Sequence, residues 1–297
     1  MQANPTLRQH KSFGKFLMDN VIIIGIILLA IVVSILRPNF LGESNLRNLL
    51  GNTAIRFIIA LGVSGCLITK GTDLSAGRTA GFTACMAAIL LQKSDYANKY
   101  WPWLGEVPVI AALAIVLGIG ALIGAVNGSV ISLFKVPPFI ATLGMQTLVY
   151  GLALVMTGAQ PLGSLRSQYT GIATGFVGNP IISYVALIAL AVGLIMWLLY
   201  NKMRYGKYMY AIGGNEAAAE VAGVNVSRSK ILIYTLAGIL YGLCGSCWQP
   251  NPAALPSTPP WATNWKPSPA APSAAYRSTA ASAAYQAYSS ACWYLRC

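Results

Sequence analysis

The stretch Asn201–Lys230, NKMRYGKYMYAIGGNEAAAEVAGVNVSRSK, is the longest polar interruption in an otherwise apolar sequence. Asn215 is a favourable helix N-cap, and Glu216 follows it in the first turn, where the helix dipole favours an anion. Gly223 comes after a run of small residues and is typical of a helix stop. The stretch therefore predicts a short surface helix fixed between two apolar segments, although an ordinary polar loop is the alternative.

The composition indicates the class of protein in which this stretch lies. Of 297 residues, 56% are hydrophobic and only 9% are charged, whereas about a quarter of the residues in a soluble domain are charged. Such a chain predicts an all-α, polytopic membrane helical bundle, because a helix satisfies its own backbone in lipid. The net charge of +13 comes from basic residues beside apolar segments, which indicates orientation in a bilayer and contact with phospholipid and not nucleic-acid binding.

Six apolar segments precede the polar stretch and a seventh follows it. The residues 1–20 are polar and basic, so the N-terminus is expected in the cytoplasm, and an even number of spans returns the chain to that side. A transmembrane domain is expected over 21–245, with the polar connection at 202–229 and outer loops at 93–106 and 158–179. The expected spans are Val21–Leu36, Asn45–Thr69, Thr79–Gln92, Val107–Phe134, Ala141–Thr157 and Pro180–Tyr200, and a seventh begins at Ile231.

A polar break, KGTDLSAGR at Lys70–Arg78, separates the second and third spans. Asp73 and Ser75 are natural helix caps, and glycines on either side free the backbone. Irregular backbone is tolerated at membrane depth only where it is buried in protein or lines a cavity. The break is therefore expected inside the bundle.

Two further patterns concern packing and polar side chains inside spans. Gly120, Gly124 and Gly128 recur every four residues and predict a smooth face on which another helix packs closely. Asn127 lies beside this face, where it forms either a helix–helix hydrogen bond or a contact with a solute. A stripe on the fifth span that includes Thr142 predicts either a solute path or a seam of hydrogen bonds. The candidate path residues are Asp73, Ser75, Asn127, Gln146 and Tyr150.

Two motifs resemble one known family. GGNEAAAEVAGVN at residues 213–225 is similar to the cytoplasmic loop of permease subunits in bacterial ATP-driven sugar importers of the ribose, galactose and xylose group, and KGTDLSAGR is similar to a second motif of that group. The variant with Thr72 resembles the galactose and methyl-galactoside importers. In the family's usual pattern a glutamate stands at the position of Ala217, whereas here Glu216 comes one residue earlier.

The resemblance implies a multi-pass permease of the bacterial inner membrane, with about ten spans in an intact member. It implies that two permease copies form the pore, that a periplasmic sugar-binding protein delivers the sugar, and that a separate ATPase subunit consumes ATP and Mg²⁺. The chain itself is then expected to bind no cofactor or metal and to be no enzyme, and it has no phosphate-binding GxxxxGK(S/T) motif. The residues that the resemblance assigns to ATPase coupling are Gly213, Gly214, Asn215, Glu216, Ala217, Ala218 and Gly223.

The sequence changes character near Ser246. From Trp248 to Cys297 there is no Gly, Val, Ile, Asp or Glu, which predicts a disordered, Pro/Ala/Ser-rich tail over 246–297. A shift of the reading frame is one hypothesis for it, and a genuine extracytoplasmic tail is the other.

Three alternatives to a sugar permease remain open. A branched-chain amino-acid permease shares the expected architecture, a secondary transporter or channel would work without an ATPase, and the altered tail could leave a non-functional, truncated permease. For the second of these Asp73 is the only candidate for ion coupling.

Overall fold

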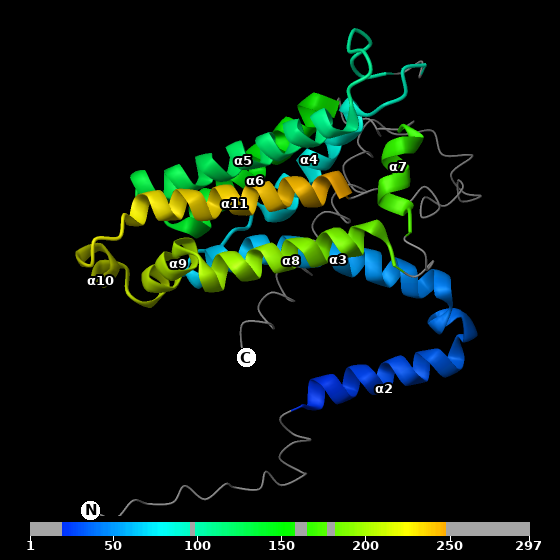
Figure 1. The fold of residues 1–297 in the computed structure, drawn as a ribbon, viewed down its shortest axis with the longest axis horizontal. Helices are drawn as coiled ribbons and strands as arrows, with labels where there is room; N and C mark the ends of the chain where they lie inside the picture. Colours follow the sequence, from blue (N-terminus) through cyan, green and yellow to red (C-terminus); the bar gives the residue numbers. More distant parts are fainter. Residues whose placement is uncertain (1–19, 96–98, 158–164, 177–181, 248–297) are drawn as a thin grey trace, which may run out of the picture. The chain divides into compact units, whose positions relative to one another are not determined.

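The computed structural model describes residues 20–95, 99–157, 165–176 and 182–247 (Figure 1). All regular secondary structure in these ranges is helical, and β pairing is limited to isolated bridges between Gln92 and Leu165 and between Phe176 and Ser183. Five helices are long and apolar enough to cross a membrane. The predicted all-α, membrane-spanning class is therefore confirmed, whereas the hypotheses on the tail from Trp248 onward fall outside the described residues.

The chain divides into two units, Met1–Leu49 and Leu50–Cys297. The first contains the helix α2 (Val21–Leu36), the 3₁₀ turn η1 (Pro38–Leu41) and the start of α3 (Glu43–Ile68). No side chain of α2 is buried, and the helix is apolar on all sides, as expected of a helix that faces lipid.

The second unit holds the rest of α3 and all later helices. These helices are α4 (Ala76–Leu90), α5 (Val109–Leu133), α6 (Pro138–Thr157), α7 (Ser167–Thr174), α8 (Tyr184–Lys202), α9 (Arg204–Gly214), α10 (Glu216–Val221) and α11 (Val226–Cys247). The helix α4 has only 15 residues and is about 22 Å long, less than the roughly 30 Å thickness of a bilayer core.

Successive long helices of the second unit run in alternating directions, so the connections between them lie at two opposite ends of the unit. The connection that contains α10 lies at one end and α7 at the other (Figure 1). The turn after α3 also lies at the α10 end, because the Lys70 ammonium donates to the Gly214 carbonyl over 3.1 Å. The loop before α5 lies at the α7 end, because Arg166 donates to the Val107 carbonyl over 2.6 Å.

The closest helix pair consists of α5 and α11, and glycines bring the two backbones together. A Cβ atom at Gly120 would lie 2.3 Å from the Gly238 carbonyl oxygen, and one at Gly124 would lie 2.1 Å from that of Tyr234. A Cβ at Gly128 would approach the Ile231 Cα to 2.7 Å. The predicted smooth face of the fourth span is therefore the surface on which α11 packs.

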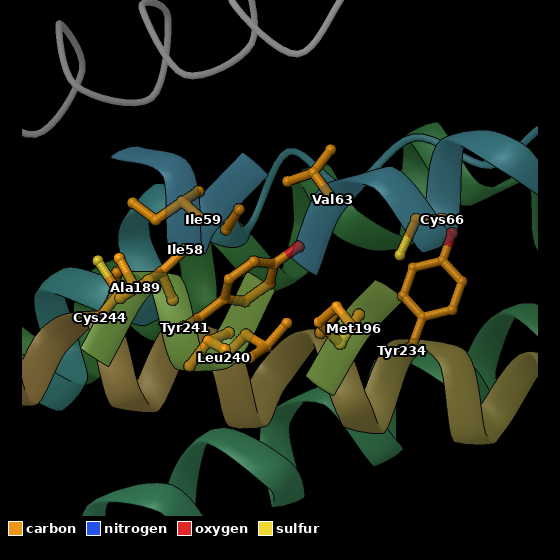
Figure 2. Close-up of a cluster of buried hydrophobic side chains, with 14 of the residues drawn as sticks. Ile58, Ile59, Val63, Cys66, Ala189, Met196, Tyr234, Leu240, Tyr241 and Cys244 are labelled. Carbon is orange, nitrogen blue, oxygen red and sulfur yellow. The ribbon is translucent and has the colours of Figure 1, made fainter. Parts of the chain in front are cut away.

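A buried cluster joins α11 to α3 and α8 (Figure 2). Tyr234 and Tyr241 extend from α11 and are almost completely buried. They pack with Ile58, Cys66 and Met196. Because lipid tails are as apolar as leucine, this shape complementarity and the polar contacts described below, not escape from water, hold the helices together.

Three predictions about local structure were wrong in part. Gly213 and Gly214, two consecutive glycines from which the sequence predicts a flexible turn before α10, instead form the end of the eleven-residue helix α9. The expected outer loop 158–179 contains the helix α7, which is fixed where Tyr169 donates to the Ser246 carbonyl over 2.6 Å. The last span begins at Val226, five residues before Ile231, so the connection is shorter than 202–229.

Candidate functional site

The helix α10 has a side-chain cap at its start, as its sequence predicts. The Asn215 side chain accepts a hydrogen bond from the Ala218 amide over 3.1 Å. A second cap, which the sequence analysis missed, lies after α10: the Asn225 side chain accepts from the Arg228 amide over 3.0 Å and begins α11. The signal was present, because an asparagine before an apolar run is a typical helix start.

The end of α10 is a two-bond C-cap centred on Gly223, which has a φ of +85°. The Gly223 amide donates to the Glu220 carbonyl over 2.9 Å, and the Val224 amide donates to the Ala219 carbonyl over 3.0 Å. This pattern is the Schellman motif, in which a glycine adopts the left-handed conformation without the cost that a Cβ imposes. The predicted helix stop is confirmed.

One side of α10 is buried and the other is exposed. Ala219 packs with Ile212 of α9 and Val226 of α11 and is 4% exposed. Val221 is 90% exposed, and Ala217 and Ala218 are also exposed. We call Ala217, Ala218 and Val221 the outer face of α10.

An ion pair fixes α10 against the following helix. Glu216 accepts from the Lys230 ammonium over 2.7 Å, and the side chains are 53% and 18% exposed. A partly exposed pair of this kind contributes at most about 1 kcal/mol, so it orients α10 more than it stabilises the bundle. The carboxylate of Glu216 therefore has a partner within this chain.

The helix before α10 is held to the end of α3. A Cβ atom at Gly213 would lie 2.0 Å from the Ile68 carbonyl oxygen, so only glycine allows this approach. The neighbouring Gly214 has open space around it, and its carbonyl accepts from Lys70. The seven coupling residues around the caps thus lie on a support formed by α3, α9 and α11.

The break between α3 and α4 forms a second candidate site, a polar cluster inside the bundle. Asp73 accepts from the Ser75 amide over 3.0 Å, from the Ser75 hydroxyl over 2.6 Å and from the Tyr241 hydroxyl over 3.0 Å. Asn127 of α5 donates to the Ser75 hydroxyl over 2.9 Å. Asp73, Ser75 and Asn127 are each at most 3% exposed, so the break is buried in protein.

The polar stripe of α6 runs along the same break and α4. Thr142 is buried, and its hydroxyl accepts from the Leu74 amide over 3.2 Å. Two turns later the Arg78 guanidinium lies 4.4 Å from the centre of the Tyr150 ring, which is a cation–π contact. Gln146 is half-buried between these two positions on the helix.

The structure therefore brings three of the five candidate path residues, Asp73, Ser75 and Asn127, into one hydrogen-bonded cluster. It distributes Gln146 and Tyr150 along α6. Sequence analysis missed Tyr241, because a tyrosine in an apolar span carries no signal of its distant partner. The prediction that Ser75 caps α4 with its side chain was wrong, since its hydroxyl donates to Asp73.

Among the described residues, no three His, Cys, Asp or Glu side chains lie close enough together to hold a metal ion. The outer face of α10 is suited to docking, and the polar cluster is suited to joining helices or to meeting a neutral, hydrogen-bonding solute.

Comparison with protein families gives a match to the model "Branched-chain amino acid transport system / permease component" over residues 45–262. No solved structure gives a significant match.

Curated relatives carry names from two kinds of sugar importer. The galactose/methyl galactoside import permease protein MglC of Escherichia coli (strain K12) is 42% identical over 240 residues, which cover 79% of this chain and 71% of the relative. The protein of the same name from Haemophilus influenzae is 41% identical, with coverage of 80% and 72%. The ribose import permease protein RbsC of Escherichia coli (strain K12) is 34% identical, with coverage of 81% and 72%.

Proposed function

We infer that this chain, which belongs to the family of permease components of the branched-chain amino acid transport system, is the membrane-spanning subunit of an ATP-binding-cassette importer. The cargo that we propose is galactose, a methyl galactoside or a closely related monosaccharide. This cargo is supported by the identity to the galactose and methyl galactoside permeases, 41–42%, which is higher than the 32–39% identity to the ribose permeases.

The observation that carries the mechanism is the outer face of α10. This short helix has a cap at each end, rests on α9 and α11, and exposes Val221. We propose that a separate ATPase subunit binds this face. In this proposal that subunit carries out the ATP chemistry and binds Mg²⁺, and this chain binds no cofactor. A second permease copy and a periplasmic sugar-binding protein complete the proposed assembly.

In this proposal, α11 transmits the movement of α10 to the rest of the bundle. The helix begins three residues after Gly223, packs backbone to backbone on α5, and meets the α3–α4 break through Tyr241. A displacement of α10 by the ATPase would therefore move α11, α5 and the polar cluster together, which is the rigid-body rocking that alternating access needs.

The distribution of charge in the second unit supports a cytoplasmic location of α10, and the basic composition of residues 1–20 supports the same side for the N-terminus. Basic side chains at the α10 end outnumber those at the α7 end, and the excess of Lys and Arg marks the cytoplasmic side. The α10 end carries Lys70, Lys135, Lys202, Arg204, Lys207, Arg228 and Lys230, and the described residues of the α7 end carry Lys93, Lys99 and Arg166.

The location can be tested with an impermeant maleimide in a variant whose six native cysteines are replaced and to which one cysteine is added at a time, with the cysteine-free chain as the blank. Val221→Cys at the α10 end and Trp103→Cys at the α7 end are matched, because these side chains are 90% and 78% exposed. We expect Val221→Cys to react only in inside-out vesicles and Trp103→Cys only in intact spheroplasts. Reaction of Val221→Cys from outside the cell would exclude contact with a cytoplasmic ATPase.

Uptake tests the function itself. Cells that lack their own galactose importers and that express the chain with its ATPase and binding protein should accumulate labelled galactose in an ATP-dependent manner. Val221→Asp should lower this uptake tenfold or more, since a charge in a docking surface costs more than about 1.4 kcal/mol, and Val221→Ala should lower it less.

A branched-chain amino acid is the second candidate cargo, because the matching family model carries that name. Uptake of labelled leucine in the same cells, with galactose uptake absent, would favour it.

A further inference from the structure

A groove of about 660 Å³ lies between α8, α9 and α11 at the α10 end of the bundle. Its walls are mostly apolar and include Leu199, Leu232, Leu236 and Ile239. From Leu232 to Ile239 the groove follows α11 for about 10 Å along the helix axis. Its volume is within the range of ligand-binding sites, roughly 300–1,000 Å³.

The two charged side chains of the groove are both basic and lie at one place on its wall. Lys202 is the last residue of α8 and Arg204 is the first of α9, so both stand where an apolar span ends. Among the described residues neither forms an ion pair with an acidic side chain. Tyr205 also lines the groove, and burial raises the pKa of its phenol, so it adds no negative charge.

The groove thus has a cationic mouth at the membrane boundary and an apolar interior that extends toward the middle of α11. An occupant that satisfies both parts has an anionic head and a hydrocarbon tail. The bilayer supplies such a molecule, and basic pockets between membrane helices bind anionic head groups. A neutral sugar would make no favourable contacts with the apolar wall, and a small soluble anion would leave the apolar interior unfilled.

We propose that this groove is a binding site for an anionic phospholipid, with the phosphate held by Lys202 and Arg204 and an acyl chain packed along Leu232, Leu236 and Ile239. Because α9 leads directly into α10, the bound lipid stabilises the support of the outer face from the membrane side. The proposal requires only that the chain resides in a bilayer and does not depend on the cargo.

Native mass spectrometry of the full chain, released from mixed phosphatidylglycerol and phosphatidylcholine of equal chain length, tests the head group. We expect retained phosphatidylglycerol and little phosphatidylcholine. The double variant Lys202→Gln/Arg204→Gln should bind phosphatidylglycerol about 30-fold more weakly, given the contribution of each basic side chain near an anionic lipid. Lys135→Gln/Arg228→Gln is the matched control, since it removes two basic side chains from the same end but outside the groove lining.

Equal retention of both lipids would overturn the proposal, and so would an equal loss in the two double variants, because it would indicate a general effect of surface charge. Ile239→Trp fills the interior and should reduce retention of phosphatidylglycerol, whereas Leu198→Trp, on the exposed face of α8, should not. Monodispersity and thermal melting of each variant show whether it remains folded.

A photocrosslinking residue at position 239 tests the source of the occupant in the intact membrane. An adduct with the mass of a phospholipid supports the proposal. An adduct with the mass of a second copy or of another protein would show that protein covers the groove, and would overturn it.

Discussion

The Tyr241 hydroxyl on α11 donates to the Asp73 carboxylate over 3.0 Å, although the two residues are 168 positions apart in the sequence. This hydrogen bond connects the irregular break between α3 and α4 to the helix that follows α10. It is buried, and both partners are at most 3% exposed.

Tyr241→Phe removes this bond and keeps the ring. Asp73 retains its two bonds from Ser75, so we expect a loss of about 1 kcal/mol in the free energy of unfolding, which is typical of a hydrogen bond inside a membrane protein. Asp73→Ala should cost more, because it also removes the bonds to Ser75. Thermal melting in detergent measures both. Tyr210→Phe, at an exposed tyrosine, is the control and should change nothing. A Tyr241→Phe variant as stable as the parent would show that the bond is dispensable.

Gly124→Ala tests the contact between α5 and α11. The added Cβ would lie 2.1 Å from the Tyr234 carbonyl oxygen, so the helices must separate, at a cost of about 1–3 kcal/mol or more. The matched control is Gly118→Ala on the same helix, where a Cβ meets nothing within 4 Å. Because alanine is the better helix former, we expect Gly118→Ala to leave the melting temperature unchanged or to raise it. Equal effects of the two changes would contradict the close packing.

Gly213 and its neighbour Gly214 offer a second matched pair at the support of α10. Gly213→Ala should push α9 away from the end of α3, because the Cβ would lie 2.0 Å from the Ile68 carbonyl oxygen, whereas Gly214→Ala enters open space. Hydrogen exchange of α9 and α10 should increase clearly in the first variant and little in the second. If both variants exchange as the parent does, the two helices are held by other contacts.

Gly223→Ala tests the C-cap of α10. Space is available around this residue, but its φ of +85° costs about 1–2 kcal/mol for a residue with a Cβ. We expect the end of α10 to loosen and ATP-driven uptake to fall more than ATP hydrolysis does. A Gly223→Asn variant should lose less, since asparagine tolerates this conformation better. Uptake that remains coupled to hydrolysis in Gly223→Ala would argue against a role of the helix end in coupling.

Local features of this protein were predictable from its sequence. The start and end of α10 depend on Asn215 and Gly223, and each acts on an amide or carbonyl within a few positions. The bounds of most apolar helices follow from runs of contiguous residues, although α11 begins five residues before the predicted Ile231. The glycine face of α5 was predictable as a close contact, because its period matches one side of a helix.

Only the tertiary structure decided which segments meet. The partner of the glycine face is α11, and the partner of Asp73 is Tyr241. The end of α9 at Gly213 packs against the backbone at the end of α3, at Ile68. The exposure of Val221 and the groove beside Lys202 likewise result from how α8, α9 and α11 pack together. The physical reason is that caps and apolar periods act within one or two helical turns, whereas contacts between helices depend on shape matches between residues far apart in the chain, and a single sequence does not show these.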